Sequence, residues 1–375
     1  MTEPDEDILT QGRPLLPKAE VVAGLLDRAI SVGWLTNGGP LHEQLETEIA
    51  PLFGPGTTRL VSSGTMAAMM ALRLGGLPEG SEVITSPVSF AATVQAILWC
   101  GFRPVFADVD PVSLNLDPEA VRRAITPRTS AILPVHFLGR PCEVDALQDI
   151  ATRHGLWLAY DAAHAFGVTL HGRPIAGWGD ASAFSLHATK LMHTGEGGAL
   201  VVNDPDLRGS MARMRNFGLA AGRMQGMGTN AKLSEAQAAL GLAVLPLVAA
   251  EAETRRRLRA SLDAALSDIP GIAPHPSAPG ASDSLQYYAL RMAPELRRRL
   301  HLALAERRIL ARDHFPLLCG PDTMLPDAPI VSARTVPAAP EAAPQVLCLP
   351  FHGGVTDRHV AAIADIARQT ARQAP

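Results

Sequence analysis

One lysine and one aspartate stand just after apolar runs that are expected to be strands, and together they indicate a specific chemistry. Lys190 lies in the segment FSLHATKLMHTGEGGAL, five residues after Ser185, and a glycine-rich turn follows it. Upstream, the apolar run 156–160 ends in Asp161. A lysine amine condenses with the aldehyde of pyridoxal phosphate, and a carboxylate keeps the pyridine nitrogen protonated so that the ring can accept electrons. A lone lysine in a loop is usually a solvated charge, but this pair predicts a catalytic Lys190 and Asp161.

A candidate phosphate site precedes the helix expected over 65–74. Ser62, Ser63 and Gly64 place small residues before that helix, where unpaired N–H groups and the positive end of the helix dipole can meet an anion. An ordinary N-cap explains the same residues, so both interpretations stay open. The chain has no Walker loop and no GxGxxG after a strand, which argues against nucleotide hydrolysis and against a dehydrogenase.

Three further features allow two interpretations each. Phe90, in the loop SPVSFAAT, either lies on a cofactor ring or covers the start of a helix. His164, three residues after Asp161, either donates to a cofactor oxygen or is a core histidine with its own partners. The polar loop before Ser234 either forms a plain N-cap or carries side chains into the site of a neighbouring subunit.

Five histidines fall within forty residues, so a metal site has to be weighed. They are His154, His164, His171, His187 and His193. Their spacing matches no HExxH pattern and no cysteine joins them, so we expect no bound metal.

Short apolar runs alternate with helical patterns through the first two thirds of the chain. Strands are expected over 82–85, 104–107, 131–135, 156–160, 181–186 and 199–202. Helices are expected between them, over 65–74, 91–99, 118–124 and 143–153. This alternation predicts an α/β fold with a mostly parallel sheet, in which ligands bind at the carboxyl ends of the strands. Asp161 stands at such an end.

After about residue 245 the pattern changes. A basic helix around 253–259 is followed by a strand over 286–292, a helix over 294–307, a proline-rich loop over 325–345, an apolar run over 346–350 and an amphipathic helix over 358–372. We therefore predict an N-terminal arm over 1–20, a large cofactor-binding domain over 21–245 and a smaller C-terminal α+β domain over 246–375. The arginines between 255 and 259 are expected on a solvated helix face.

Composition bounds the class of protein. The chain has 375 residues, of which 47% are hydrophobic and 19% charged, as is typical of a folded globular protein. A net charge of −4 offers no attraction for a nucleic acid. The four cysteines show no CxxC spacing, and the N-terminus lacks a signal-peptide pattern. The uncharged stretches 83–102 and 236–250 are interrupted by polar residues or by proline. We expect a cytoplasmic protein with no membrane segment.

Together these motifs resemble the DegT/DnrJ/EryC1/StrS sugar aminotransferases, which are fold-type I pyridoxal phosphate enzymes. The resemblance covers nearly the whole chain, from residues 35–40 to residues 349–352. Seven segments carry it in the family's order: SSGTMAAMMAL, PVSFAAT, FADVDPVSLNLDP, LPVHFLGRPCEVDAL, DAAHAFG, FSLHATK with EGGA, and GTNAKLSEAQAAL. It implies a large domain with helices on both faces of the sheet, a smaller C-terminal α+β domain, and pyridoxal 5'-phosphate as the cofactor, with pyridoxamine phosphate as its form between half-reactions.

The resemblance also assigns roles around the cofactor ring. Lys190 would hold the cofactor covalently and move a proton, and Asp161 would pair with the ring nitrogen. A negative charge there favours the protonated ring. Phe90 would stack on the ring, and His164 would lie near the phenolic oxygen.

Further roles follow for the phosphate and for the partner subunit. Gly64, Thr65 and Ser185 would hold the cofactor phosphate. Asn230 would reach the same site from a partner subunit, which implies a homodimer with shared active sites. Asn37 would line the sugar pocket together with His187.

The resemblance finally implies the reaction. Relatives with histidine at position 190 dehydrate sugars, whereas the lysine of this chain implies transamination. The segment from Arg215 to Gly218, which reads RNFG, and a lysine in place of the usual arginine at Lys232 depart from many members. With these variants the chain looks most like members that aminate C4 of a dTDP-4-keto-6-deoxyhexose for deoxyaminosugar biosynthesis. The donor would be L-glutamate and the acceptor a nucleotide-diphosphate keto sugar, in a ping-pong scheme.

Three alternatives stay open. The chain could act at C3 of the sugar or as a dehydratase-like enzyme with the same cofactor. It could also be a non-catalytic, cofactor-binding regulator. A metal-dependent hydrolase built on the histidines is the third.

Overall fold

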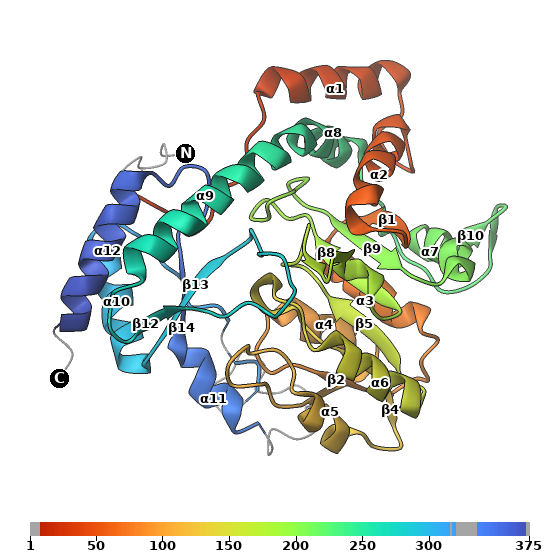
Figure 1. The fold of residues 1–375 in the computed structure, drawn as a ribbon. Coiled ribbons are helices and arrows are strands. Elements are labelled where there is room, and N and C mark those ends of the chain that lie inside the picture. The colour runs from red at the N-terminus through yellow and green to blue at the C-terminus, as the bar shows by residue number, and fades with distance from the viewer. Residues whose placement is uncertain (1–7, 316, 320–335, 373–375) are drawn as a thin grey trace.

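The computed structural model describes residues 8–315, 317–319 and 336–372, and a seven-stranded sheet forms its centre (Figure 1). The strand order is β1-β9-β8-β5-β4-β2-β3. All pairings from β8 to β3 are parallel, and only β9 runs against its neighbours. The predicted mostly parallel α/β sheet is confirmed. Its strands are β1 (Thr57–Val61), β2 (Glu82–Thr85), β3 (Arg103–Phe106), β4 (Thr129–Leu133), β5 (Trp157–Asp161), β8 (Ala181–Ser185) and β9 (Gly198–Val202).

The six predicted strands all form, and their ends differ from the prediction by at most two residues. The sequence pattern does not indicate β1, because its residues TTRLV are polar at three of five positions. This strand is the edge of the sheet, pairs antiparallel with β9, and turns Arg59 outward to Glu46. An edge strand needs no continuous apolar run, which explains why the hydrophobic pattern misses it.

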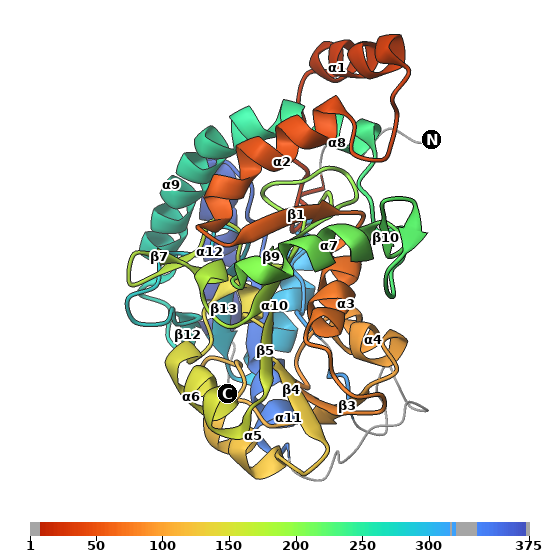
Figure 2. The same cartoon turned by 90° about the vertical axis from the view of Figure 1, so that its right-hand side faces the viewer.

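Helices cover both faces of the sheet, as the two views in Figures 1 and 2 show. Alternate strand residues point to opposite faces. Ala159 and Leu200 pack with α3 and α4, whereas Leu158 and Val201 pack on the other side with α2, α6 and α8. The helices of this part are α1 (Ala19–Val32), α2 (Pro40–Phe53), α3 (Gly64–Leu74), α4 (Ala91–Trp99), α5 (Pro118–Ala124), α6 (Val144–His154), α7 (Arg208–Arg215) and α8 (Glu235–Val244).

A second, smaller lobe follows the long helix α9 (Val248–Leu266). Its antiparallel sheet has the order β12-β13-β14, and Leu262, Leu290, Leu300 and Ile363 lie in its core. The predicted strand and helices of this part are confirmed with small shifts. The proline-rich loop expected over 325–345 is wrong in its described part, because residues 338–342 form the short helix α11 and residues 343–345 a 3-10 turn, while residues 325–335 lie outside the described part. The elements are β12 (Ile272–Pro274), β13 (Tyr288–Met292), α10 (Pro294–Glu306), α11 (Ala338–Ala342), β14 (Val346–Leu349) and α12 (Asp357–Arg372).

The helical run of α8 and α9 connects the two lobes. Val244 packs in the core beneath the large sheet, and Leu258 packs in the core of the small lobe. By length and composition the stretch Glu235–Leu266 could cross a membrane, a test that core helices of soluble proteins also pass. Here α8 packs on α1 and α2, and α9 packs on α12.

The arginine run on α9 corrects one prediction. Arg255 is only 3% exposed and pairs with Glu251, and Arg259 is largely buried as well. Both donate to backbone carbonyls of the segment 284–287. These two side chains lie one helical turn apart and so share a face, which the composition of the run alone does not reveal. Arg256 and Arg257 do face solvent, as expected.

Two small ribbons extend from the large lobe. One pairs β6 (Thr169–Leu170) with β7 (Arg173–Pro174), and the other pairs β10 (Leu219–Ala220) with β11 (Arg223–Met224). The β10–β11 ribbon projects from the right-hand edge of the molecule in Figure 1. Its position leaves Met224 76% exposed.

Candidate active site

Asp161 is the last residue of β5, and a chain of hydroxyl groups holds its carboxylate. Because it follows Ala159 by two positions, its side chain leaves the sheet on the side of α4. Thr93 of α4 donates its Oγ1–H to Asp161 Oδ2 at 2.6 Å, and the N–H of Ala163 donates to Oδ1 at 3.1 Å. Ser89 Oγ lies 2.6 Å from Thr93 Oγ1. The carboxylate is thereby fixed in one orientation at the end of the sheet.

Burial dominates the electrostatics of this carboxylate. It raises the pKa of Asp161, and the donors Thr93 and Ala163 and the charge of Lys190 act in the opposite direction. A cation placed beside the carboxylate would favour its ionised form further. The site is therefore built to pair Asp161 with a positive group.

Lys190 lies in the turn after β8. The N–H of Lys190 donates to the carbonyl of His187 at 2.8 Å. Its Nζ makes no hydrogen bond or ion pair with any described residue. Burial lowers the pKa of Lys190 to about 8, and the charge of Asp161 opposes that effect. An amine with this pKa is partly neutral near pH 7, and the neutral form is the nucleophile.

An aromatic cluster surrounds His164, which follows Asp161 by three residues. The ring of His164 stacks on Phe315, with centroids 5.2 Å apart and planes 7° apart, and meets the edge of Tyr287 at 5.2 Å. His164 is 7% exposed, and its buried Nδ1 has no hydrogen-bond partner among the described residues. Burial, Lys190 and His314 all lower the pKa of His164, so the ring is neutral. The unpaired nitrogen is available to a ligand.

Phe90 caps the start of α4 and is 57% exposed. Its ring lies 6.3 Å from that of Phe315, at the rim of the same cluster. The side chain therefore has a free face, as a residue that stacks on a ligand requires.

The start of α3 lies against the end of β8. Ser63 caps the helix by accepting from the N–H of Met66 at 3.1 Å. A Cβ added at Gly64 would lie 2.8 Å from Cβ of Ser185, so the two segments touch and only glycine fits. The N–H groups of Gly64 and Thr65 have no partners inside the helix. Small residues, unpaired N–H groups and the Ser185 hydroxyl thus meet at one helix end, which is suited to a phosphate.

The three remaining predicted residues lie at the surface. Asn37 is exposed in the loop before α2, with a positive φ of 62°. His187 comes two residues after Ser185, and its ring Nδ1 lies 2.9 Å from Oγ1 of Thr189 and accepts from the N–H of that residue at 3.2 Å. Asn230 is exposed beside the β10–β11 ribbon and pairs with Asn216 through the backbone. The contacts within this chain do not bring Asn230 to Lys190.

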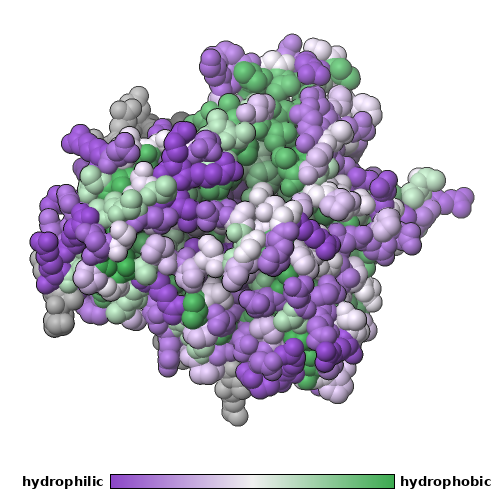
Figure 3. All heavy atoms as spheres, viewed as in Figure 1, coloured by the Kyte–Doolittle hydropathy of each residue, from purple (hydrophilic) through white to green (hydrophobic). Residues whose placement is uncertain are grey.

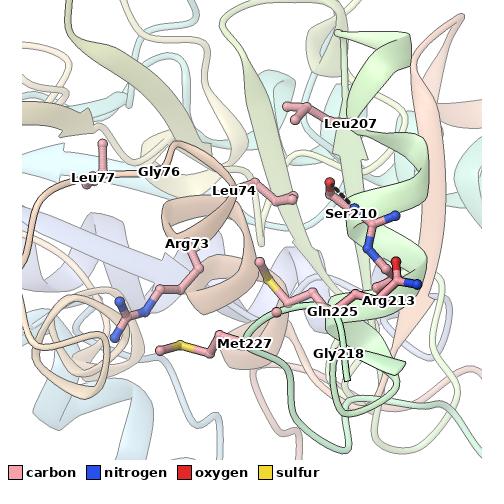
Figure 4. A pocket seen from close by; sticks show the side chains of 12 residues that line it. Arg73, Leu74, Gly76, Leu77, Leu207, Ser210, Arg213, Gly218, Gln225 and Met227 are labelled. Carbon is pink, nitrogen blue, oxygen red and sulfur yellow. Dashed lines mark hydrogen bonds between the residues drawn. The ribbon is translucent and has the colours of Figure 1, made fainter. Parts of the chain in front are cut away.

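Two other arrangements bear on alternative functions. Within the described residues, no group of histidine, cysteine, aspartate or glutamate side chains is placed to hold a metal ion. A cavity of about 380 Å³ does open between the C-terminal end of α3, α7 and the segments that flank the β10–β11 ribbon, with Arg73, Ser210, Arg213 and Met227 in its wall (Figure 4). It is at the opposite end of α3 from Gly64 and contains none of the predicted site residues.

Sequence reasoning missed several residues of the site. Thr93 belongs to the SPVSFAAT segment, and its position one helical turn after Ser89 could have indicated a shared face. Tyr287, His314 and Phe315 come from segments more than one hundred residues downstream of Asp161. No local pattern links them to it.

These residues fit pyridoxal phosphate on structural grounds. A buried amine without a partner, a buried carboxylate and an unpaired ring nitrogen surround the ends of β5 and β8. The tight approach of Gly64 to Ser185 supplies a phosphate cradle at the same edge of the sheet. Each functional group of the cofactor thus has a matching protein group.

Comparison with known proteins agrees with this fit. Residues 19–368 match the DegT/DnrJ/EryC1/StrS aminotransferase family. The dTDP-4-amino-4,6-dideoxy-D-glucose transaminase of Escherichia coli is 33% identical over 362 residues, which are 94% of this chain and 96% of the relative. The dTDP-4-dehydro-2,3,6-trideoxy-D-glucose 4-aminotransferase of Saccharopolyspora spinosa is 33% identical over 346 residues, covering 87% and 88%. The crystal structure of DesI in the presence of its TDP-sugar product superposes with a TM-score of 0.90 at 36% identity, covering 98% of this chain and 94% of that one.

Proposed function

This chain belongs to the DegT/DnrJ/EryC1/StrS aminotransferase family, and from that premise we propose that it aminates C4 of a dTDP-linked 4-keto-6-deoxyhexose with L-glutamate as donor. It is a pyridoxal phosphate-dependent aminotransferase of the fold-type I class, as the sequence predicts. The names of the Escherichia coli and Saccharopolyspora spinosa relatives, each of which specifies dTDP and position 4, support the acceptor and the carbon. The product would serve deoxyaminosugar biosynthesis.

The main support for this chemistry is that Lys190 and Asp161 lie at the same edge of the sheet, after β8 and at the end of β5. When bound, pyridoxal phosphate supplies an electron sink that stabilises negative charge on the substrate carbon. Asp161, oriented by Thr93, would pair with the ring nitrogen and keep it protonated. Gly64, Thr65 and Ser185 would hold the phosphate, and His164 would donate to the phenolic oxygen.

Lys190 would act as the general acid and base. With a pKa lowered to about 8, Nζ can release and accept a proton near neutral pH. It would remove the proton from the donor carbon in the first half-reaction and return one to C4 of the sugar in the second. Phe90 would cover one face of the cofactor and help to exclude water from the reacting carbon.

A homodimer with shared sites completes the proposal. Asn230 is exposed at the base of a projecting ribbon, and Met224 and Met227 near it are 76% and 68% exposed. On the face in Figure 3 apolar surface gathers around α1 and α8, and Ile30 and Val32 of α1 are 64% and 65% exposed. A second copy would cover such surfaces. Asn230 would then contact the phosphate in the site of the partner subunit.

The state of the cysteines supports a cytoplasmic location. Cys100, Cys142, Cys319 and Cys348 are all buried and free. Free thiols in a folded chain are typical of a reducing compartment.

Turnover with a defined acceptor tests this function. The holoenzyme would be incubated with L-glutamate and dTDP-4-keto-6-deoxyglucose, and the products analysed by NMR. We expect 2-oxoglutarate and a 4-amino sugar in equal amounts. Turnover with the 3-keto isomer of the acceptor and not with the 4-keto sugar, giving an amine at C3, would replace the regiochemical assignment. A dehydrated sugar without 2-oxoglutarate would replace transamination by dehydration. No reaction with any keto sugar, despite bound cofactor, would favour the regulator.

A further inference from the structure

The peptide groups on both sides of Lys190 are held by one side chain from the small lobe. The N–H of Leu191 donates to Oε1 of Gln286 at 2.9 Å, and Nε2 of Gln286 donates to the carbonyl of Thr189 at 2.8 Å. Gln286 lies just before β13, 95 residues from Leu191 in the sequence. A single amide therefore closes a ring with the main chain around Lys190.

Two arginines of α9 fix the backbone that presents this amide. Arg255 donates to the carbonyl of Leu285 at 2.8 Å, and Arg259 donates to those of Ser284 and Tyr287 at 2.7 and 3.1 Å. The residues before and after Gln286 are thus anchored by charged donors, which form stronger hydrogen bonds than neutral ones. The anchored segment has little freedom to move relative to α9.

The same segment contacts the second loop of the site. Tyr287 follows Gln286 directly and packs its ring against His164. Adjacent residues of the small lobe therefore touch the Lys190 turn and the turn after Asp161. Because Gln286 and Tyr287 are consecutive residues of one anchored segment, they fix the Lys190 turn relative to the turn after Asp161.

We propose that Gln286 is a positioning residue for Lys190 and that it couples the small lobe to the reactive amine. The inference rests on the proposed function, because it takes Lys190 Nζ as the group that moves the proton. The lysine side chain has four rotatable bonds and no partner for Nζ, so the direction of its first bond depends on the backbone of the turn. Gln286 fixes that backbone on both sides. An amide does so without adding a charge that would alter the lowered pKa of Lys190.

Two substitutions separate geometry from charge. Gln286→Ala removes both hydrogen bonds. Gln286→Glu keeps the acceptor for the N–H of Leu191, loses the donor to Thr189, and adds a negative charge beside the turn. Gln345→Ala is the matched control, because Gln345 of the small lobe also bridges two groups, accepting from Arg291 at 3.0 Å and donating to the carbonyl of Glu341 at 3.0 Å.

The first measurement uses holoenzyme without substrate. The visible absorption of bound cofactor is followed as a function of pH, together with hydrogen exchange of the peptide that contains Leu191. We expect Gln286→Glu to move the midpoint of the pH titration upward by roughly half a unit or more, because a nearby negative charge favours the protonated form of the nitrogen that links Lys190 to the cofactor. Gln286→Ala should speed exchange of the 189–191 peptide, and Gln345→Ala should change neither.

The second measurement is steady-state turnover. We expect Gln286→Ala to lower kcat roughly tenfold to a hundredfold with a smaller change in KM, because misplacing a catalytic group slows the chemical step. Wild-type values of kcat, midpoint and exchange in both Gln286 variants would overturn the inference. A wild-type holoenzyme that does not respond to any amino donor would instead overturn the proposed function, so the two failures are distinguishable.

Discussion

Replacing Thr93 by valine tests how the protein controls the charge of Asp161. Valine has nearly the shape of threonine, so packing around the fully buried Thr93 changes little. The substitution removes the donor that lies 2.6 Å from Asp161 Oδ2. It also leaves the hydroxyl of Ser89 without its contact to Thr93.

The expected magnitude follows from the type of bond. A hydrogen bond to a charged group contributes about 1.5–3 kcal/mol. Its loss raises the pKa of Asp161 further above the usual range, because burial already raises this pKa and one of the opposing donors is removed. A carboxyl that is more often protonated pairs less well with the ring nitrogen. The Kd for pyridoxal phosphate should therefore rise roughly tenfold to a hundredfold.

Cofactor titration of the apoprotein, followed by absorbance, measures that Kd. Thr85→Val is the matched control, because Thr85 is as deeply buried as Thr93 and its hydroxyl donates to the neutral carbonyl of Leu133 at 2.8 Å. Both variants should lose about 1 kcal/mol or more of apoprotein stability, but only Thr93→Val should lose cofactor affinity. An unchanged Kd in Thr93→Val, or an equal loss in both variants, would refute the reasoning.

Three further predictions concern the reactive amine, the dimer and acid stability. Lys190→Ala should fold normally and turn over at least ~10²-fold more slowly, measured as 2-oxoglutarate release, and ordinary turnover would remove Lys190 from catalysis. Asn230→Ala should weaken cofactor retention. A mixed dimer of Asn230→Ala and Lys190→Ala subunits should recover activity, because one of its two shared sites then contains both an intact Lys190 and an intact Asn230. No recovery after subunit exchange would argue against Asn230 acting across the dimer. Burial raises the pKa of Glu46, but His42, Arg215 and other donors lower this pKa to about 2. The charged carboxylate therefore stabilises the fold above pH ~4.5, and this contribution is lost as the pH falls toward 2. Glu46→Gln should therefore lose up to about 3 kcal/mol at pH 7 and show a flatter acid limb in urea unfolding, and an unchanged limb would contradict the assignment.

The sequence predicts those parts of the site that depend on neighbouring residues. Asp161 and Lys190 follow apolar runs that are buried on both faces of a parallel sheet, and such runs are recognisable without knowing their partners. The glycine at Gly64 and the cap at Ser63 are local features too. Their meeting at one edge follows from the parallel topology, which the alternation of elements indicates.

The parts that could not be predicted depend on contacts between distant segments. Whether the arginines of α9 face solvent is decided by the carbonyls of residues 284–287, which the helix pattern does not contain. Gln286 donates to the carbonyl of Thr189, which is 97 residues away in the sequence, and no motif around Gln286 indicates this contact. The stacking of Phe315 on His164 also could not be predicted, because no sequence pattern in either segment indicates a contact with the other.

The most direct test of the central claim is a single half-reaction. The purified holoenzyme would be mixed with L-glutamate and no sugar, while the absorbance of the cofactor and the release of 2-oxoglutarate are recorded. The proposed function predicts loss of the band of lysine-bound cofactor with one 2-oxoglutarate released for each site, and neither change in Lys190→Ala. A holoenzyme whose spectrum stays constant, with no 2-oxoglutarate formed, would contradict L-glutamate as the donor and Lys190 as the group that moves the proton in its half-reaction.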